Sequence, residues 1–242
     1  MDTVYLRHIS LILADQEAFL RESLYAALAQ AVTDCSKSST RNRVLDVGVG
    51  RGELLQLLKS RGFETYGVDL EPGCIESAGP FGDCRLGGIE EIGQVFKGTT
   101  FDTVVCSHVL EHLDSPFLAL KSLESLEATS YVFAVPNVLR PVRIIRAVLG
   151  SRVPDHSEHV YAWGVPEFRS LLGRSGFVVD KWYADRVTIN PLRGKAGTSL
   201  SKAFRPVEVQ ALPQLTPMLS SSLIVRCHRA GTNGNHPHLS DD

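Results

Sequence analysis

Residues 44–58 read VLDVGVGRGELLQLL, and residues 66–70 read YGVDL. An apolar strand runs into a glycine-rich loop, a helical pattern follows, and a second strand ends on Asp69. The three loop glycines are Gly48, Gly50 and Gly52. Because glycine lacks a Cβ, such a loop lets the backbone approach a ligand closely at the edge of an open α/β sheet. The pattern predicts a nucleoside site in which Asp69 accepts from the ribose hydroxyls.

The spacing of the loop glycines distinguishes between kinds of nucleotide. A dinucleotide-binding fingerprint, G-x-G-x-x-G, would have glycine at position 53, where this chain has Glu53. An anion at that position repels a pyrophosphate, which argues against a dehydrogenase. The chain also has no phosphate-binding G-x-x-x-x-G-K motif followed by Ser or Thr, so nucleoside triphosphate chemistry has no support.

The G-x-G-x-G loop and Asp69 resemble the first motif of the class I S-adenosylmethionine-dependent methyltransferases. A second similar stretch is FDTVVCSHVLEHL at residues 101–113, and the resemblance extends over residues 42–229. It implies S-adenosylmethionine as the cofactor. It also implies that Asp46 orders the loop and reaches towards the methionine amino group of the cofactor. The residues alone leave open that Asp46 only accepts from loop amides.

The other expected cofactor contacts depart in part from the family pattern. Family members carry an acid near the adenine at the end of the third strand, but residues 86–89 read LGGI. We therefore expect the backbone amides of Gly88 and Ile89 to contact the adenine. Ser107 ends the fourth strand, where the resemblance places the methyl donor. The expected cofactor-binding residues are Asp46, Gly48, Gly50, Gly52, Asp69, Gly88, Ile89 and Ser107.

Composition and cysteine usage indicate a soluble protein of a reducing compartment. The 242 residues are 43% hydrophobic and 21% charged, as in an ordinary globular domain. The five cysteines are an odd, widely spaced set without a C-x-x-C pair, which predicts free thiols. The apolar run ISLILA at residues 9–14 is too short to span a membrane. We expect a cytoplasmic protein without a transmembrane segment, and the sequence leaves its oligomeric state open.

Strand and helix patterns alternate along the chain. Strands are expected at 43–47, 64–68, 83–87, 101–107, 131–137, 177–183 and 221–229, and helices within 4–32, 53–60, 72–78, 118–126, 141–149 and 166–176. This alternation predicts an α/β fold, a Rossmann-like seven-stranded, mostly parallel sheet with an antiparallel last strand and helices on both faces. No helix is expected between the last two strands. We divide the chain into a helical extension (1–41), a methyltransferase domain (42–230) and a disordered tail (231–242).

Residues 108–112 read HVLEH, the residue order of an inverted zinc-peptidase motif. A peptidase is not expected, because the motif follows a parallel strand and Pro116 limits any helix there to about one turn. The stretch also resembles, in part, the metal-binding E-x-x-E-H run of the small-RNA 2′-O-methyltransferases, with His108 in place of the first glutamate. We favour hydrogen bonds of Glu111 and His112 that stabilise the loop, and we expect no metal.

Histidines are the expected acid–base groups, since their unperturbed pKa lies near neutrality. The candidate catalytic residues are His108, His112, His156 and His159. For each of them a structural role is the competing interpretation. Methyl transfer depends largely on positioning, so a base is needed only where the acceptor loses a proton early.

Two segments are basic, although the net charge of the chain is −2. Residues 139–154 hold several arginines, and residues 186–207 hold arginines and lysines, both without an acid. Residues 141–149 are expected to form a basic amphipathic helix at the ligand edge of the sheet. This arrangement predicts a lid over an anionic acceptor, and a solvated helix packed on the core is the alternative.

These observations favour an S-adenosylmethionine-dependent methyltransferase that moves a methyl group to oxygen or nitrogen of a small, anionic molecule. The alternative enzyme is a metal-assisted RNA 2′-O-methyltransferase, with nucleic acid as the less favoured acceptor. The alternative from another class is a non-catalytic regulator that binds the cofactor.

Overall fold

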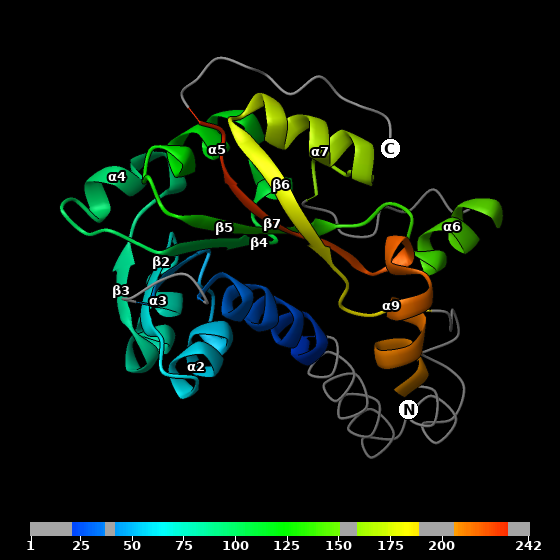
Figure 1. Ribbon diagram of the computed structural model, residues 1–242, viewed down its shortest axis with the longest axis horizontal. Helices are drawn as coiled ribbons and strands as arrows, with labels where there is room; N and C mark the ends of the chain where they lie inside the picture. Colours follow the sequence, from blue (N-terminus) through cyan, green and yellow to red (C-terminus); the bar gives the residue numbers. More distant parts are fainter. Residues whose placement is uncertain (1–20, 37–41, 151–158, 189–205, 232–242) are drawn as a thin grey trace, which may run out of the picture.

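The structure is a computed structural model that describes residues 21–36, 42–150, 159–188 and 206–231. Across these residues the strands form one seven-stranded sheet in the order β3-β2-β1-β4-β5-β7-β6 (Figure 1). The strands are β1 (Arg43–Val47), β2 (Glu64–Asp69), β3 (Asp83–Leu86), β4 (Thr103–Ser107), β5 (Ser130–Pro136), β6 (Phe177–Tyr183) and β7 (Ser222–Arg229). Strands β1 to β5 run parallel, and β7 pairs antiparallel with both β5 and β6. The predicted Rossmann-like sheet is confirmed.

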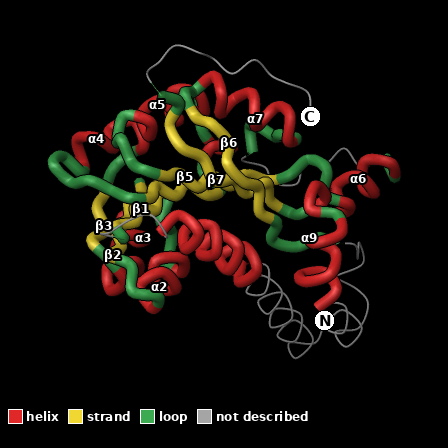
Figure 2. Tube along the Cα trace, in the orientation of Figure 1, coloured by secondary structure: helices red, strands yellow, loops and turns green. Residues whose placement is uncertain are grey.

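Helices cover both faces of this sheet (Figures 1 and 2). Besides the helix at residues 21–36, they are α2 (Glu53–Ser60), α3 (Pro72–Ala78), α4 (Ile92–Val95), α5 (Pro116–Glu124), α6 (Pro141–Val148), α7 (Val165–Arg174) and α9 (Leu212–Leu215). Shorter turns are 3₁₀ at Gly79–Phe81, Ile89–Glu91, Leu110–His112 and Pro217–Leu219, and π at Val207–Ala211. Leu120 of α5 and Phe168 of α7 pack with Val104 in one core cluster. Leu58 of α2 packs with Val105 in another, since successive strand residues point to opposite faces.

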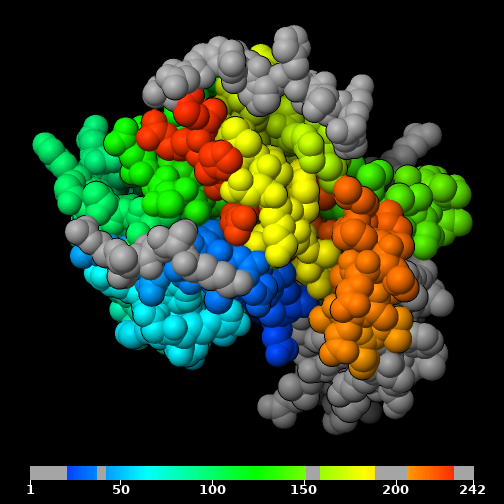
Figure 3. Space-filling model, viewed as in Figure 1, coloured from blue at the N-terminus to red at the C-terminus, as the bar shows by residue number. Residues whose placement is uncertain are grey.

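The helix at residues 21–36 is part of the hydrophobic core. Leu28 and Val32 are fully buried, and they belong to the same cluster as Val44 of β1 and Ile224 of β7. In the space-filling view the blue surface of this helix lies between the cyan surface around α2 and the orange surface of the segment before β7 (Figure 3). Because the helix joins early and late parts of the chain, we propose that the domain includes it rather than beginning at residue 42.

The connection between β6 and β7 is more structured than the sequence predicts. It holds a π turn, α9 and a 3₁₀ turn within residues 206–219, so the expectation of a link without a helix is wrong. Pro213 and Pro217 each lie at the start of a helical turn, where the missing amide is tolerated. The Val187 amide donates to the Glu208 carbonyl (2.9 Å), which holds the connection against the chain that leaves β6. The expected antiparallel pairing is right.

The start of α5 shows how local chemistry sets the boundary of an element. The Ser115 hydroxyl accepts from the Leu118 amide (3.4 Å), and Pro116 occupies the first turn. Both features favour a helix start. Helix α5 therefore begins at Pro116 rather than at the expected residue 118.

Several expectations concern the environment of the chain and its ends. Among the described helices, none is long and apolar enough to cross a membrane. All five cysteines lie within the described residues and are free thiols, as predicted. Residues 1–20 of the expected extension, residues 189–205 of the second basic segment and residues 232–242 of the expected tail lie outside the described residues.

Candidate active site

A cavity of about 350 Å³ lies at the carboxyl ends of β1, β2 and β4. Its walls include Gly48, Asp69, Leu70, Ile89, His108 and His112. This edge of an open α/β sheet is where ligands bind, and the volume is typical of a small-molecule site. Predicted cofactor and catalytic residues thus share one cavity. A wider hollow of about 550 Å³ between α5 and α7 has none of them among its described walls.

Asp69 at the end of β2 ties the glycine loop to the sheet. One carboxylate oxygen, Oδ2, accepts from the Gly50 amide (2.9 Å), and the other, Oδ1, accepts from the Glu71 amide (3.0 Å). Each carboxylate oxygen has a second lone pair, so Asp69 still has acceptor capacity for two ribose hydroxyls. The side chain that the sequence predicts to hold the ribose therefore also orders the loop beside it.

The three loop positions require glycine for different structural reasons. All three have positive φ, at 78° for Gly48, 53° for Gly50 and 83° for Gly52. A Cβ on Gly48 would lie 2.3 Å from the Val109 Cγ2, and a Cβ on Gly52 would lie 2.8 Å from the Ala78 Cα. A Cβ on Gly50 would have no atom within 4 Å. Packing thus requires Gly48 and Gly52, whereas Gly50 borders open space.

Asp46 is buried beneath the loop, with only 4% of its surface exposed. Burial raises the pKa of its carboxyl from 3.8 to about 8, and the nearby charges of Asp69 and Glu53 act in the same direction. A neutral carboxyl at physiological pH is therefore expected until a cation approaches. This is a property that the sequence motif alone does not reveal.

The expected adenine end of the cavity is formed by the turn after β3. Gly87 and Ile89 are among its described walls, whereas Gly88 and Ser107 are not. Gly88 lies just before the 3₁₀ turn that begins at Ile89. Sequence reasoning also missed Leu70, which lines the cavity and is 70% exposed. An exposed leucine next to Asp69 gives an aromatic base an apolar surface.

His108 follows β4 with an unusual backbone conformation, a φ of 55°. Its amide donates to the Ala134 carbonyl (2.9 Å). Its Nδ1 lies 3.1 Å from Oε1 of Glu111, and its Nε2 lies 3.1 Å from Oγ of Ser222. Ser222 is 114 positions away in the sequence, and no motif links it to His108, so sequence reasoning missed it.

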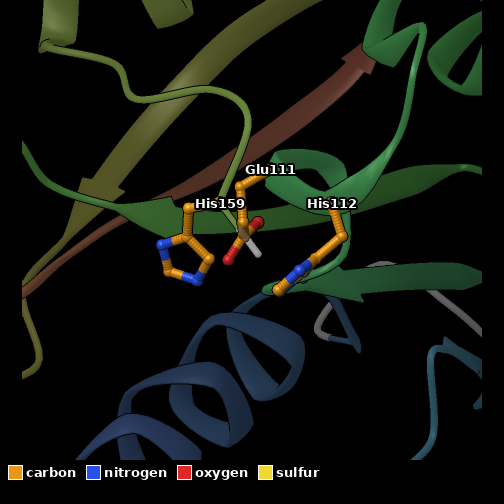
Figure 4. A group of neighbouring side chains, drawn as sticks. All are labelled: Glu111, His112 and His159. Atoms are coloured by element: carbon orange, nitrogen blue, oxygen red, sulfur yellow. The ribbon is translucent and has the colours of Figure 1, made fainter. Parts of the chain in front are cut away.

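Glu111 is fully buried, yet neither of its carboxylate oxygens accepts a hydrogen bond from the described residues. Its backbone carbonyl accepts from the Val160 amide (2.9 Å), which places His159 beside the turn. One ligand atom each from Glu111, His112 and His159 lies within 4.8 Å of the others (Figure 4). The Glu111 side chain does not make the expected loop-stabilising hydrogen bond with the described residues. His156 lies outside the described residues.

The chain matches known methyltransferases over most of its length. A family model described as a methyltransferase domain matches residues 20–181. The ubiquinone biosynthesis O-methyltransferase of Azorhizobium caulinodans is 28% identical over 167 residues, which cover 63% of this chain and 64% of that protein. The protein of the same name from Xanthomonas euvesicatoria is 33% identical over 91 residues, which cover 35% of this chain and 38% of that protein. The chain thus spans less than two thirds of the length of these relatives.

Solved structures share the fold at lower sequence identity. Magnesium protoporphyrin IX methyltransferase from Synechocystis has a TM-score of 0.59 and 16% identity, over 88% of this chain and 86% of that one. The strand order and the cavity at the ends of β1 and β2 agree with the match to the family model, which covers more than half of the chain. The chain therefore belongs to the methyltransferase domain family, and it shares the fold of a solved methyltransferase.

Proposed function

We propose that the cavity binds S-adenosylmethionine through the residues that the sequence singled out. Asp69 would hold the ribose, the turn at Gly88 and Ile89 the adenine, and Asp46 the methionine amino group. The observation that carries this proposal is the position of Asp69, whose carboxylate lines the cavity and accepts from the Gly50 amide. When bound, the cofactor supplies a methyl carbon that its sulfonium makes electrophilic.

We further propose that the methyl acceptor is an oxygen of a small molecule. The names of the two relatives, both ubiquinone biosynthesis O-methyltransferases, favour oxygen over nitrogen. A hydroxyl must lose its proton as the new bond forms, which calls for a base near neutral pH. His108 and His112 line the cavity on the side of β4 and supply that chemistry. His108 is our choice for the base.

An anionic acceptor is supported by helix α6, which follows β5 at the same edge of the sheet. The helix carries Arg143 and Arg146, and none of its residues is buried. Cations beside an active site attract and orient anions. The double variant Arg143→Glu, Arg146→Glu should raise the KM of a carboxylated acceptor without changing the Kd of S-adenosylmethionine. An unchanged KM would refute the role of α6.

The first test of the proposed function is calorimetry with S-adenosylmethionine and S-adenosylhomocysteine. We expect the wild-type protein to bind both and Asp69→Ala to lose binding, since the ribose loses its acceptor. Arg85→Ala is a suitable control, because Arg85 pairs with Asp83 on the edge strand β3 and is not among the described walls of the cavity. Absence of binding in the wild type would refute the proposal.

The second test is turnover with labelled cofactor and paired phenols that differ by one carboxylate. Transfer to the phenolic oxygen, with a preference for the carboxylated member, would support both the oxygen and the anion. Transfer to an amine but not to a phenol would refute the choice of oxygen. Any turnover excludes the non-catalytic regulator.

A metal-assisted methyltransferase acting on an RNA 2′-hydroxyl is the second candidate, favoured by Glu111, His112 and His159. A buried carboxylate without a hydrogen bond is costly, and a divalent cation would compensate it. Zinc ligands lie about 2.0–2.2 Å from the metal and hence about 3.4 Å from one another in a tetrahedral site. The three atoms, which lie within 4.8 Å of one another, would therefore have to move closer by up to roughly 1.4 Å. Elemental analysis and Mn²⁺ or Zn²⁺ titration of wild type and Glu111→Gln test this candidate. Absence of bound metal, or equal binding by the variant, would refute it.

A further inference from the structure

Helix α6 presents its apolar side to solvent. Because residues three or four positions apart share one side of a helix, one side of α6 is formed by Val142, Ile144, Ile145, Val148 and the C-cap residue Leu149. Arg143 and Arg146 lie on the other side. Val148 and Leu149 are each 80% exposed and Ile144 is 41% exposed, whereas both arginines are partly buried. A surface helix of a globular domain turns its apolar side towards the core, so this reversed orientation indicates a contact surface.

A second exposed apolar group lies next to α6, although it comes from far along the chain. Leu215 at the end of α9 is 77% exposed, and Met218 in the following 3₁₀ turn is 51% exposed. The Asn137 side-chain amide donates to the Met218 carbonyl (2.9 Å), and its side-chain oxygen accepts from the amide of Leu139, which is itself 42% exposed. In Figure 3 the green surface of α6 adjoins the orange surface of the segment before β7. The two apolar groups are therefore neighbours.

The charges of these two segments have one sign. Residues 139–150 hold Arg140, Arg143 and Arg146 and no acid, and residues 209–221 hold no charge. Anionic lipid headgroups attract arginines, while apolar side chains of the same helix enter the boundary between headgroups and acyl chains. The long arginine stems allow the guanidinium groups to reach the headgroups. A second copy of this chain would instead bring the same arginines face to face, which opposes self-association through this surface.

We propose that the docking surface formed by Leu139, α6, Leu149, Leu215 and Met218 binds an anionic phospholipid membrane. Helix α6 has eight residues, whereas a membrane span needs about 20, so the helix lies flat at the interface. Val148 and Leu149 enter the apolar boundary, and the arginines remain at the headgroups. The lipid then lies on the side of the domain where β5 ends. This inference goes beyond the proposed function and does not depend on it, because docking requires neither cofactor nor acceptor.

Vesicle flotation of the full chain tests the docking. We expect the wild-type protein to float with vesicles of equal parts phosphatidylcholine and phosphatidylglycerol and to bind pure phosphatidylcholine vesicles far less. Added salt should weaken the binding, because salt screens exposed charges. Leu149→Ser should lower the partition coefficient about tenfold or more, the factor that burial of one leucine side chain supplies. The matched control is Leu118→Ser, since Leu118 is 57% exposed on α5 and should leave partitioning unchanged.

The wild-type protein alone can overturn the inference, by failing to bind the mixed vesicles or by binding pure phosphatidylcholine equally well. An equal effect of Leu149→Ser and Leu118→Ser would also overturn it. Both positions are exposed, so both variants should keep the wild-type Tm in thermal denaturation. A dimer in sedimentation velocity that Leu149→Ser dissociates, without vesicle binding, would show that the surface joins two copies and would overturn the inference too. Failure of cofactor binding in calorimetry would refute the proposed function and leave the docking intact.

Discussion

Asp46 should make cofactor binding depend on pH in a way that can be measured. Its carboxyl is buried, and its pKa is raised to about 8 by that burial and by Asp69 and Glu53. The proposed partner is the α-ammonium group of S-adenosylmethionine, which pairs with the ionised carboxylate only. Below pH 8, binding of the cofactor should therefore expel one proton from Asp46.

The size of the effect follows from the pKa. Each pH unit below the pKa of a group adds about 1.36 kcal/mol to the free energy of ionising it. Between pH 7 and pH 5.5 this amounts to about 2 kcal/mol, or roughly a 30-fold rise in Kd. An α-amino group has a pKa of about 7.7–8.0, so the cofactor stays cationic over this range and its own titration does not contribute.

Isothermal calorimetry at pH 5.5, 6.3 and 7 measures this slope. Two buffers of different ionisation enthalpy at pH 6.3 give the number of protons released, which should approach one. Asp46→Asn should bind more weakly than wild type at pH 7 and should show neither the slope nor the proton release. A wild-type Kd that is constant from pH 5.5 to 7, or a slope that persists in Asp46→Asn, would refute the reasoning.

Three further predictions concern stability and loop packing. Between about pH 4 and pH 8 the folded protein keeps a proton on Asp46 that the unfolded chain has lost, so the free energy of unfolding falls as pH rises through this range. Asp46→Asn removes this effect. Thermal denaturation should therefore show a larger rise in Tm for the variant at pH 8 than at pH 5. Gly52→Ala should cost about 1–3 kcal/mol of unfolding free energy, because its Cβ meets Ala78 at positive φ. Gly50→Ala, with open space around its Cβ, should lower the free energy of unfolding less than Gly52→Ala does and should weaken cofactor binding more. A larger loss of stability in Gly50→Ala than in Gly52→Ala would contradict the packing argument. Ser115→Ala removes the cap of α5 and should cost about 1 kcal/mol in urea denaturation, with the cofactor Kd unchanged.

The sequence predicts the first half of the sheet well because its signals there are local. The glycine loop, the helix pattern after it and the acid at the end of the next strand all lie within residues 44–69, and α2 has the bounds that the sequence predicts. Strand β6 is likewise predicted to the residue, since its apolar run is bounded by Gly176. The connection before β7 is not predicted, because its helical turns are short and begin at Pro213 and Pro217, so they show no helical apolar periodicity.

In the candidate site, too, contacts between neighbouring strands are predicted from the sequence and contacts between distant parts of the chain are not. Gly48, Asp69 and Ile89 are found from sequence because each follows or ends one of three neighbouring parallel strands, β1, β2 and β3, at one edge of the sheet. The contact of His108 with Ser222 is not, since it depends on β7 entering the sheet beside β5 from far along the chain. Such a contact leaves no spacing pattern in the sequence.

The acids of the loop region argue for a cationic ligand independently of the motif. Asp46, Glu53 and Asp69 are close enough for the last two to raise the pKa of the first. A pyrophosphate would add negative charge to this group and face Glu53 at the start of α2. S-adenosylmethionine instead brings a sulfonium and an ammonium group against one carboxylate, which relieves the repulsion among the three acids. The substitution of glycine by Glu53 that argues against a dinucleotide therefore also favours a cofactor with net positive charge, and Glu53→Gln should weaken its binding.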